Sequence, residues 1–281
     1  MRVFARRFRV TGGAATGCRR GPRARCAGAR SRSIRGVKGV ILAGGKGTRL
    51  NPLTRITNKH LLPIYDRPMV TYAIEALVNA GVTELMLVTG GTHAGEFFRL
   101  LGDGHEYGID RLFYGYQEHE GGIAEALGIA ERFVAGDRVL VMLADNIFER
   151  SISPAVQNFE RQQRGGRIVL AQLPDPEHLC HLGVAELDGE RVLRIIEKPL
   201  VPPSEFAVTG IYFYDEAVWE MLPKLKPSGR GELEITDVNN GYVQQGTMEY
   251  DVVEGFWGDA GESIDAYYAV NDFVRANGAN K

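Results

Sequence analysis

The chain has 281 residues, of which 44% are hydrophobic and 24% are charged, a balance typical of globular proteins that bury a sizeable core. No apolar run reaches the roughly 20 residues that a membrane-spanning helix needs, and the glycines follow no period, which excludes membrane-spanning, collagen-like and repeat proteins. Three cysteines cannot form a disulfide framework, so we expect a reduced, cytoplasmic protein.

The formal net charge of −2 conceals an asymmetry between the two ends of the chain. Residues 1–36 contain eleven arginines and no lysine, aspartate or glutamate, whereas the rest has 22 basic and 35 acidic residues. Proteins that bind nucleic acids present clustered lysine and arginine to the phosphate backbone. We therefore expect the acidic body to bind small molecules, with neither a nucleic acid nor a membrane as its partner.

Residues 1–36 are expected to form a disordered leader, because they lack the apolar periodicity of a helix or strand. Three functions are open for such a leader: an organelle transit peptide, a twin-arginine export signal or a basic arm. The export signal is disfavoured, because no apolar stretch of roughly 7–15 residues follows Arg6 and Arg7. The alternative is that the leader is not translated and that the native protein starts at Val37, a valine that a GUG start codon would explain.

The first half of the body, from residue 38, alternates short apolar runs with amphipathic segments, which is typical of strand–helix–strand units on a parallel sheet. In chain order, we expect a strand at 39–43, a helix at 68–80 and a strand at 84–89. Pro68 at its first turn and Gly81 after its last residue mark the ends of that helix. The later predicted elements are a helix at 93–101, a strand at 112–117, a helix at 123–134, a strand at 139–144, a helix at 154–163 and a strand at 168–173.

The second half begins with two strand-like runs, 184–187 and 191–196, on either side of Asp188-Gly189. This dipeptide favours a type I′ hairpin turn, so part of the sheet is expected to be antiparallel. A strand at 210–214, helices at 216–225 and 234–245, a strand at 248–254 and a terminal helix from Ser263 complete the chain. No linker divides residues 37–281, which predicts one α/β domain with a Rossmann-like, mixed but mostly parallel sheet flanked by helices, and a second lobe for substrate.

A glycine-rich loop follows the first strand, with Gly44, Gly45 and Gly47 in four positions and with Lys46 and Arg49 beside them. Ligands of open α/β sheets bind at the carboxyl ends of the strands. Glycines let backbone N–H groups approach an anion closely, and the two cations add charge. The spacing fits neither the Walker loop nor the dinucleotide fingerprint. A glycine-rich turn without a ligand is the alternative.

Lys59 follows Arg49 by ten residues, in the segment 57–63. A triphosphate and a second phosphate repel each other by about 4 kcal/mol per pair of unit charges at ~4 Å and an effective dielectric of ~20. Cations must offset this repulsion, and Lys59 together with Arg49 is suited to do so. An ordinary solvated lysine is the alternative.

Five segments resemble the sugar-1-phosphate nucleotidylyltransferases: 42–50, 59–63, 144–146, 197–199 and 208–210. The segment 230–237, Arg-Gly-Glu-Leu-Glu-Ile-Thr-Asp, is similar to the glucose-1-phosphate thymidylyltransferases within that family. The resemblance extends from about residue 38 to the end of the chain. It implies the nucleotide-diphospho-sugar transferase fold, the substrates dTTP and α-D-glucose 1-phosphate, and the products dTDP-glucose and pyrophosphate.

The resemblance also assigns roles to single residues. Arg49 and Lys59 are implied to be catalytic by neutralising the transferred phosphate, while the sugar phosphate attacks in line without a general base. Asp145 and Asp259 are implied to hold Mg²⁺, and a helix cap is the alternative role for Asp145. The residues matched to nucleotide binding are Leu42, Gly44, Gly45, Gly47, Thr48, Gln117 and Gly122. Those matched to the sugar phosphate are Asn146, Gly183, Glu197, Lys198, Val208, Thr209 and Arg230.

Among the departures from the family pattern, two bear on the substrate and the assembly. Leu182 replaces an aromatic residue before Gly183, which leaves the hexose less certain than the reaction. The chain also ends about twenty residues after Asp259, without the helical tail that in longer members helps to build the tetramer and its feedback site. Whether this chain forms a homo-oligomer therefore stays open.

Two alternatives stand beside this interpretation: a pyrophosphorylase that uses UTP or another hexose 1-phosphate, and a sugar-nucleotide sensor without catalysis. The methyl and the 2′-hydroxyl that distinguish dTTP from UTP are worth only about 1–3 kcal/mol per contact. A sensor needs no set of two cations and two carboxylates, which favours the enzyme. A zinc site at His178, Cys180 and His181 is disfavoured because no fourth ligand follows at zinc-like spacing, and the segment 175–182 is expected to be a loop.

Overall fold

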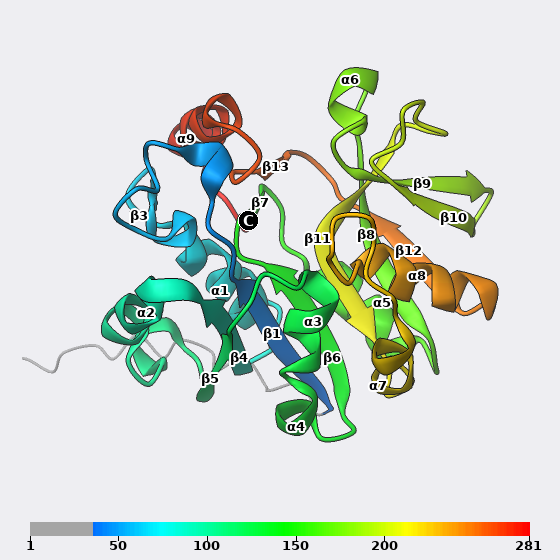
Figure 1. Ribbon diagram of the computed structural model, residues 1–281, viewed down its shortest axis with the longest axis horizontal. Helices are drawn as coiled ribbons and strands as arrows, with labels where there is room; N and C mark the ends of the chain where they lie inside the picture. The colour runs from blue at the N-terminus through cyan, green and yellow to red at the C-terminus, as the bar shows by residue number, and fades with distance from the viewer. Residues whose placement is uncertain (1–35) are drawn as a thin grey trace, which may run out of the picture. The chain divides into compact units, whose positions relative to one another are not determined.

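A mixed sheet of nine strands forms the centre of the fold (Figure 1). The computed structural model describes residues 36–281, so the predicted leader falls, except for Gly36, outside the described residues. Four neighbouring strands are parallel: β5 (Arg111–Gln117), β4 (Glu84–Gly90), β1 (Val37–Ala43) and β6 (Arg138–Leu143). Strand β1 is buried on both faces and has an almost wholly apolar sequence, as expected for a central parallel strand.

The other half of the sheet is mainly antiparallel. Strand β11 (Phe206–Tyr214) runs antiparallel to β6, β8 (Gly166–Gln172) and β9 (Gly183–Asp188), while β12 (Met248–Val252) pairs parallel with β8. The predicted hairpin of β9 with β10 (Arg191–Glu197) is confirmed, but the predicted type I′ turn is wrong. Asp188 pairs with Arg191, so the turn residues are Gly189 and Glu190, and only Gly189 has a positive φ, as a type II′ turn requires.

Helices cover both faces of the sheet, which confirms the predicted fold class (Figure 1). One core cluster joins the sheet to α1 (Met69–Asn79), α2 (Ala94–Leu101) and α5 (Ser153–Arg161). The cluster on the other face includes residues of α3 (Ile123–Gly128), α4 (Glu131–Val134), α7 (Val218–Met221) and α8 (Ile235–Gln244). Within residues 36–281, none of the helices is long and apolar enough to cross a bilayer.

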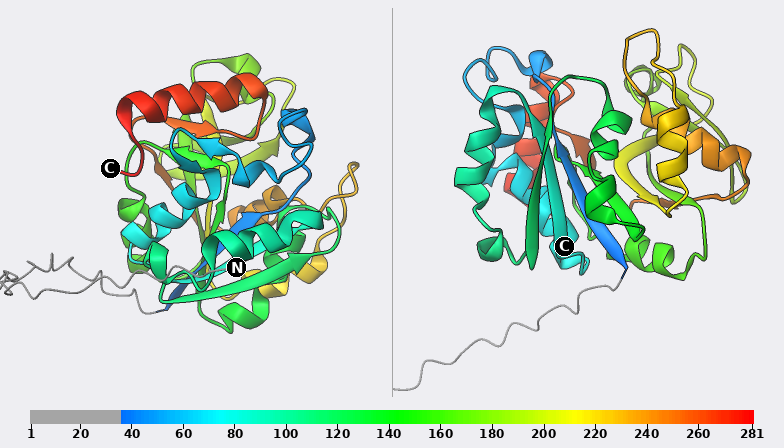
Figure 2. Two further views of the ribbon diagram at one scale, coloured as in Figure 1. Left: turned by 90° about the vertical axis from the view of Figure 1, so that its left-hand side faces the viewer. Right: turned by 60° about the horizontal axis from the view of Figure 1, so that its bottom comes forward.

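A third cluster packs the terminal helix α9 (Ile264–Asn277), red in Figure 2, against the start of α1 and against Ile64, Ile147 and Ala260. Ile147 lies on the short strand β7 (Asn146–Phe148), and Ala260 follows β13 (Trp257–Asp259), which pairs with β7 outside the main sheet. Ser263 caps α9 by accepting a hydrogen bond from the Ala266 N–H, at the predicted start of the helix. This arrangement fixes the segment that carries Asp259 against the end of β6.

Several predicted boundaries are wrong for local reasons. The helix predicted at 123–134 is divided into α3 and α4, since Gly128 has low helix propensity and a tighter Ala130–Leu127 bond follows it. The helix predicted at 216–225 ends in a 3₁₀ turn at Leu222–Lys224, because Pro223 has no N–H to donate. The predicted loop 175–182 contains α6 (Pro176–Leu179), a single turn capped by Asp175. Strands β2 (Pro63–Ile64), β3 (Arg67–Pro68), β7 and β13 were not predicted, since two or three residues show no period.

We expect Gly165→Ala to destabilise the fold much more than Gly136→Ala. Both glycines have positive φ, +99° and +85°, but a Cβ on Gly165 would collide with the Thr247 carbonyl, where β8 meets β12, whereas Gly136 faces open space. Backbone strain alone costs about 1 kcal/mol, and the collision adds roughly 1–3 kcal/mol. Urea unfolding of both variants measures the difference; equal losses would contradict the close approach.

Candidate active site

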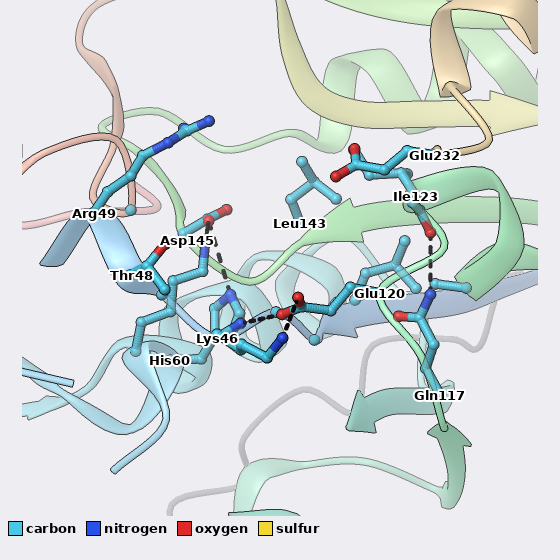
Figure 3. Close-up of a pocket in the computed structure, with 18 residues that line it drawn as sticks. Lys46, Thr48, Arg49, His60, Gln117, Glu120, Ile123, Leu143, Asp145 and Glu232 are labelled. Atoms are coloured by element: carbon cyan, nitrogen blue, oxygen red, sulfur yellow. Dashed lines mark hydrogen bonds and ion pairs between the residues drawn. The ribbon is translucent and has the colours of Figure 1, made fainter. Parts of the chain in front are cut away.

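A cavity of about 370 Å³ opens at the carboxyl ends of β1 and β6 (Figure 3). It is lined by all seven residues matched to nucleotide binding, and by Arg49, Lys59 and Asp145. The carboxyl end of the sheet is where the fold predicts a ligand. The residues of the sugar-phosphate set lie outside this lining. Five of them are on or directly after β9, β10 and β11, whereas Asn146 is on β7 and Arg230 is in the loop before α8.

The glycine loop forms one wall of the cavity. Gly45 and Gly47 have positive φ, +91° and +62°, a conformation that glycine adopts without strain. The Thr54 hydroxyl donates to the Gly47 carbonyl at 2.8 Å and fixes the end of the loop. Within the described residues, the N–H groups of Gly45 and Gly47 donate to no protein acceptor, so both are available to an anion.

Lys59 and Asp145 form a buried ion pair at the base of the cavity. The Lys59 Nζ lies 2.5 Å from Asp145 Oδ2. Burial disfavours both charges, but each stabilises the other, so the pKa of Lys59 is raised and the pKa of Asp145 is held well below its usual range. The site therefore contains a fixed ammonium and a fixed carboxylate.

His60 supports this pair from below as a neutral ring. It is 2% exposed, its Nδ1 lies 2.9 Å from Asn58 Oδ1, and its Nε2 lies 3.8 Å from Asp145 Oδ2. Burial lowers the pKa of His60 despite the nearby carboxylate. Asn58 also accepts the His60 N–H and so caps the 3₁₀ turn Lys59–Leu61, which sets the direction of Lys59.

Asp259 comes from β13 and completes the polar cluster. A Cβ placed on Gly261 would lie 2.6 Å from Asp145 Oδ2, 2.7 Å from Lys59 Nζ and 3.2 Å from Asp259 Oδ1, so the three groups face one point. Asp259 Oδ1 also accepts the Gly261 N–H at 2.8 Å. Burial and the Asp145 charge raise the pKa of Asp259 to about 7.

These groups fit a divalent cation of the Mg²⁺ type. The point that they share is a cradle that any side chain at position 261 would fill. It is lined by two carboxylates, one in the turn between β6 and β7 and one on β13. Mg²⁺ takes oxygen ligands and uses few protein carboxylates, leaving other positions to water and phosphate. Among residues 36–281, no group of three or more His, Cys, Asp or Glu side chains is arranged to hold a metal, so two carboxylates are what this site offers.

Asn146, whose role as a sugar contact stays a prediction, joins several parts of the site. Its side chain is buried; Oδ1 accepts from the Gly210 N–H at 2.8 Å and from Trp257 Nε1 at 2.7 Å, while Nδ2 donates to Asp145 Oδ1 at 3.1 Å. The amide thus joins β7, β11 and β13 behind the carboxylate. A Cβ on Gly210 would come within 2.6 Å of the amide nitrogen, so this contact needs a glycine.

Gln117 and Gly122 form the far wall of the cavity. The Gln117 Nε2 donates to Glu125 Oε2 at 2.7 Å and to the Gly122 carbonyl at 3.2 Å. Gly122 has φ of +96°, and its backbone packs so closely on Leu233 that a Cβ would lie 2.5 Å from the Leu233 carbonyl oxygen. This contact carries Glu232 to the cavity, opposite Arg49 in Figure 3.

Four of the predicted sugar-phosphate residues gather on the other side of Arg49. Gly183 and Glu197 are register partners in β9 and β10, and the Glu197 Oε1 lies 3.3 Å from Arg230 and 4.0 Å from Lys198. Burial, Arg230 and Arg49 together lower the pKa of Lys198, despite the favourable charge of Glu197. The charge of Arg49 therefore acts on Lys59 in the cavity and on Lys198 outside its lining.

Val208 and Thr209 lie on β11, and they differ in exposure. Val208 is half-buried beside the cluster, whereas Thr209 is fully buried and its hydroxyl donates to the Val169 carbonyl at 2.9 Å. The hydroxyl of Thr209 is thus used inside the sheet. Its backbone is what it can offer to a ligand.

Several residues that line the cavity are absent from the predicted site. Glu120 and Glu232 are acidic residues in loops, and a single sequence contains no signal that they reach a phosphate site. For Lys46, the sequence predicts only a charge beside the glycine loop and no specific binding role. The remaining ones are His60, Ile123, Ala126, Leu143 and Gly261. The outer rim carries a further ion pair, in which His178 of α6 meets Glu262 at 2.7 Å and has its pKa raised chiefly by that bond.

The Asp259 pKa makes stability depend on pH. In metal-free protein, Asp259 stays protonated in the folded state up to about pH 7, whereas it ionises near 3.8 when unfolded. Its contribution is thus complete below 3.8 and is lost as the pH rises towards 7, at up to about 1.4 kcal/mol per pH unit. Asp145 has the opposite sign and acts below pH 3.8.

We therefore expect the free energy of unfolding of the wild-type protein in EDTA to fall between pH 4 and 7 relative to that of Asp259→Asn. Urea unfolding at several pH values provides the comparison. Added Mg²⁺ is the control, and it should flatten the wild-type curve because it favours the carboxylate. Parallel curves for the two proteins would contradict a protonated Asp259.

Comparisons with known proteins agree with this geometry. A family described as "Nucleotidyl transferase" matches residues 38–277. The chain is 43% identical over 244 residues to a glucose-1-phosphate thymidylyltransferase of an Actinoplanes species, covering 85% of this chain and 78% of that protein. It is 42% identical over 229 residues to the enzyme of the same name from Neisseria meningitidis, covering 80% and 78%.

Solved structures show the same fold. A protein from Bacillus anthracis assigned as a glucose-1-phosphate thymidylyltransferase, crystallised in complex with a sucrose, superposes with a TM-score of 0.80 at 44% identity, over 85% of this chain and 95% of that one. A UDP-glucose pyrophosphorylase complexed with UDP-glucose shares the fold at 22% identity and a TM-score of 0.73, over 85% and 98%. The chain is therefore a nucleotidyltransferase that belongs to the family of the glucose-1-phosphate thymidylyltransferases.

Proposed function

We propose that the chain transfers a nucleotidyl group from dTTP to α-D-glucose 1-phosphate, forming dTDP-glucose and pyrophosphate with Mg²⁺ as the cofactor. The observation that carries the proposal is that Arg49 lines the cavity with the glycine loop, while its charge also acts on Lys198 beside Glu197. A single guanidinium within reach of both sides suits a reaction that joins two phosphates. The thymidylyltransferase relatives support the choice of dTTP and glucose 1-phosphate.

Nucleotide binding falls to the glycine loop and the wall at Gln117. The free N–H groups of Gly45 and Gly47 would donate hydrogen bonds to phosphate oxygens, and Thr48 and Leu42 line the same space. Gln117 presents an amide at the opposite wall, where it can pair with a polar edge of the base. Because its Nε2 is held by Glu125 and Gly122, the orientation of this amide is fixed before the nucleotide arrives.

The sugar phosphate would bind at the cluster of Glu197, Lys198 and Arg230. Glu197 carries the only carboxylate among the predicted sugar residues and suits hexose hydroxyls, while Lys198 and Arg230 supply charge for the phosphate. Both cations border Glu197, so the phosphate would be directed towards Arg49 and the nucleotide.

The chemistry needs positioning and charge rather than a general base. A phosphate oxygen of the sugar phosphate is already an anion, and it attacks the α-phosphorus of dTTP as the bond to pyrophosphate breaks. Arg49 and Lys59 offset the repulsion between the two anions and stabilise the charge that develops on the transferred group. The Lys59 ammonium is held in place by Asp145, so it need not reorganise during the reaction.

Asp145 and Asp259 would hold Mg²⁺, consistent with the shared point in front of Gly261. When bound, Mg²⁺ withdraws charge from phosphate oxygens and helps to orient them. Asn146 keeps one oxygen of Asp145 occupied and so directs the other towards that point. Because the pKa of Asp259 is about 7, its proton must leave before the carboxylate can serve as a ligand.

Arg49→Ala and Lys59→Ala should each lower kcat by about 10²–10³-fold, since each removes a preorganised charge from the transferred phosphate. Pyrophosphate release with dTTP, glucose 1-phosphate and Mg²⁺ measures the effect. Arg275→Ala, which removes an exposed guanidinium of α9, is the matched control and should retain full turnover. Full turnover of Arg49→Ala would refute the catalytic assignment.

A panel of dTTP, UTP, dCTP, dATP and dGTP against several hexose 1-phosphates tests the substrates. We expect the highest kcat/KM for dTTP with glucose 1-phosphate and the second highest for UTP, because thymine and uracil share the polar edge that Gln117 can bind, and cytosine does not. Pyrophosphate production is the readout. A preference for a purine would contradict the role of Gln117, and nucleotide binding without any turnover would favour a sensor.

A further inference from the structure

Glu120 places a carboxylate on the glycine loop. Its Oε1 accepts the backbone N–H of Lys46 at 2.8 Å, and its Oε2 lies 2.9 Å from the Lys46 Nζ (Figure 3). An amide and an ammonium are the groups with which such a loop binds phosphate oxygens. Glu120 therefore satisfies, from within the chain, donors that suit an anionic ligand.

The contact also stands between two cavities. Gly45, Lys46, Gln117 and Glu120 line both the 370 Å³ cavity and a second one of about 470 Å³. The second cavity lies on the other side of the loop, at the ends of β4 and β5, and includes His93 and His119. A Glu120 side chain that leaves Lys46 thus has space beside it, next to two imidazoles.

The loop that carries Glu120 is anchored at its ends only. Gln117 and the Gly121 N–H are both bound to Glu125, whereas Glu118, His119 and Glu120 are exposed. Among residues 36–281, Lys46 is the sole hydrogen-bonding partner of the Glu120 side chain. Moving Glu120 therefore breaks these two contacts and leaves the anchors intact.

We propose that Glu120 is an internal competitor at the triphosphate site and thereby sets the nucleotide affinity. This inference rests on the proposed function. In the free protein, the carboxylate occupies the Lys46 amide and ammonium; triphosphate binding displaces it towards the second cavity and takes over both donors. The cost of displacement is small, because Lys46 and Glu120 are 74% and 47% exposed and such pairs are weak.

Glu120→Gln and Glu120→Ala test the inference. Both remove the competing charge, so the Kd for dTTP, measured by calorimetry with Mg²⁺, should fall about two- to fivefold. The matched control is Glu118→Gln, and its Kd should equal that of the wild type. It removes a neighbouring charge in the same loop that, within residues 36–281, forms no hydrogen bond or ion pair with the glycine loop. Thermal unfolding confirms that the exposed substitutions leave the fold intact.

Three results would overturn the inference. An unchanged Kd in both Glu120 variants excludes competition. A higher Kd in these variants means that Glu120 helps to shape the loop. An equal fall of the Kd in Glu118→Gln means that only the net charge of the loop matters. Wild-type turnover separates this failure from a failure of the proposed function: if the wild type neither binds dTTP nor releases pyrophosphate, both proposals fail together.

Discussion

The buried pair of Lys59 and Asp145 is the interaction on which the site depends. An ammonium and a carboxylate at 2.5 Å, away from water, persist only because each offsets the desolvation of the other. Removing one partner would leave an uncompensated buried charge. The pair also connects the loop after β1 to the end of β6, so one contact fixes the positions of both the predicted catalytic lysine and the predicted metal ligand.

Around this pair the charges are balanced in a way that suits a cation and two anionic reactants. Asp145 is ionised and Lys59 is charged, whereas His60 is neutral and Asp259 keeps its proton up to about pH 7. Loss of that proton on binding a divalent cation would give the site its second carboxylate. The guanidinium of Arg49 lines the same cavity and has no carboxylate partner among the described residues.

The sequence predicts the fold well because its signals are local. Buried parallel strands such as β1 are continuous apolar runs, and three glycines and two cations indicate a ligand-binding loop after β1. The pairing of Asp145 with Asp259 could be inferred only from the family resemblance, since β7 and β13 are too short to show a period. The structure brings these groups together, and their roles remain predictions.

Other features of the site depend on contacts between segments that are distant in the chain. Such contacts cannot be read from a single sequence. The sequence does not reveal that the Asn146 amide contacts Asp145, Gly210 and Trp257, and its role towards a sugar stays a prediction. Gly261 has no motif of its own, and only its neighbours in space explain the absence of a side chain. Glu120 reaches Lys46 across the cavity from a loop after β5.

A titration of Mn²⁺ followed by electron paramagnetic resonance, with and without dTTP, tests the carboxylate site most directly, because Mn²⁺ takes the same oxygen ligands as Mg²⁺. The account predicts a protein-bound Mn²⁺ signal in the wild type that is lost or strongly weakened in Asp145→Asn and in Asp259→Asn. An unchanged signal and affinity in both variants would contradict it.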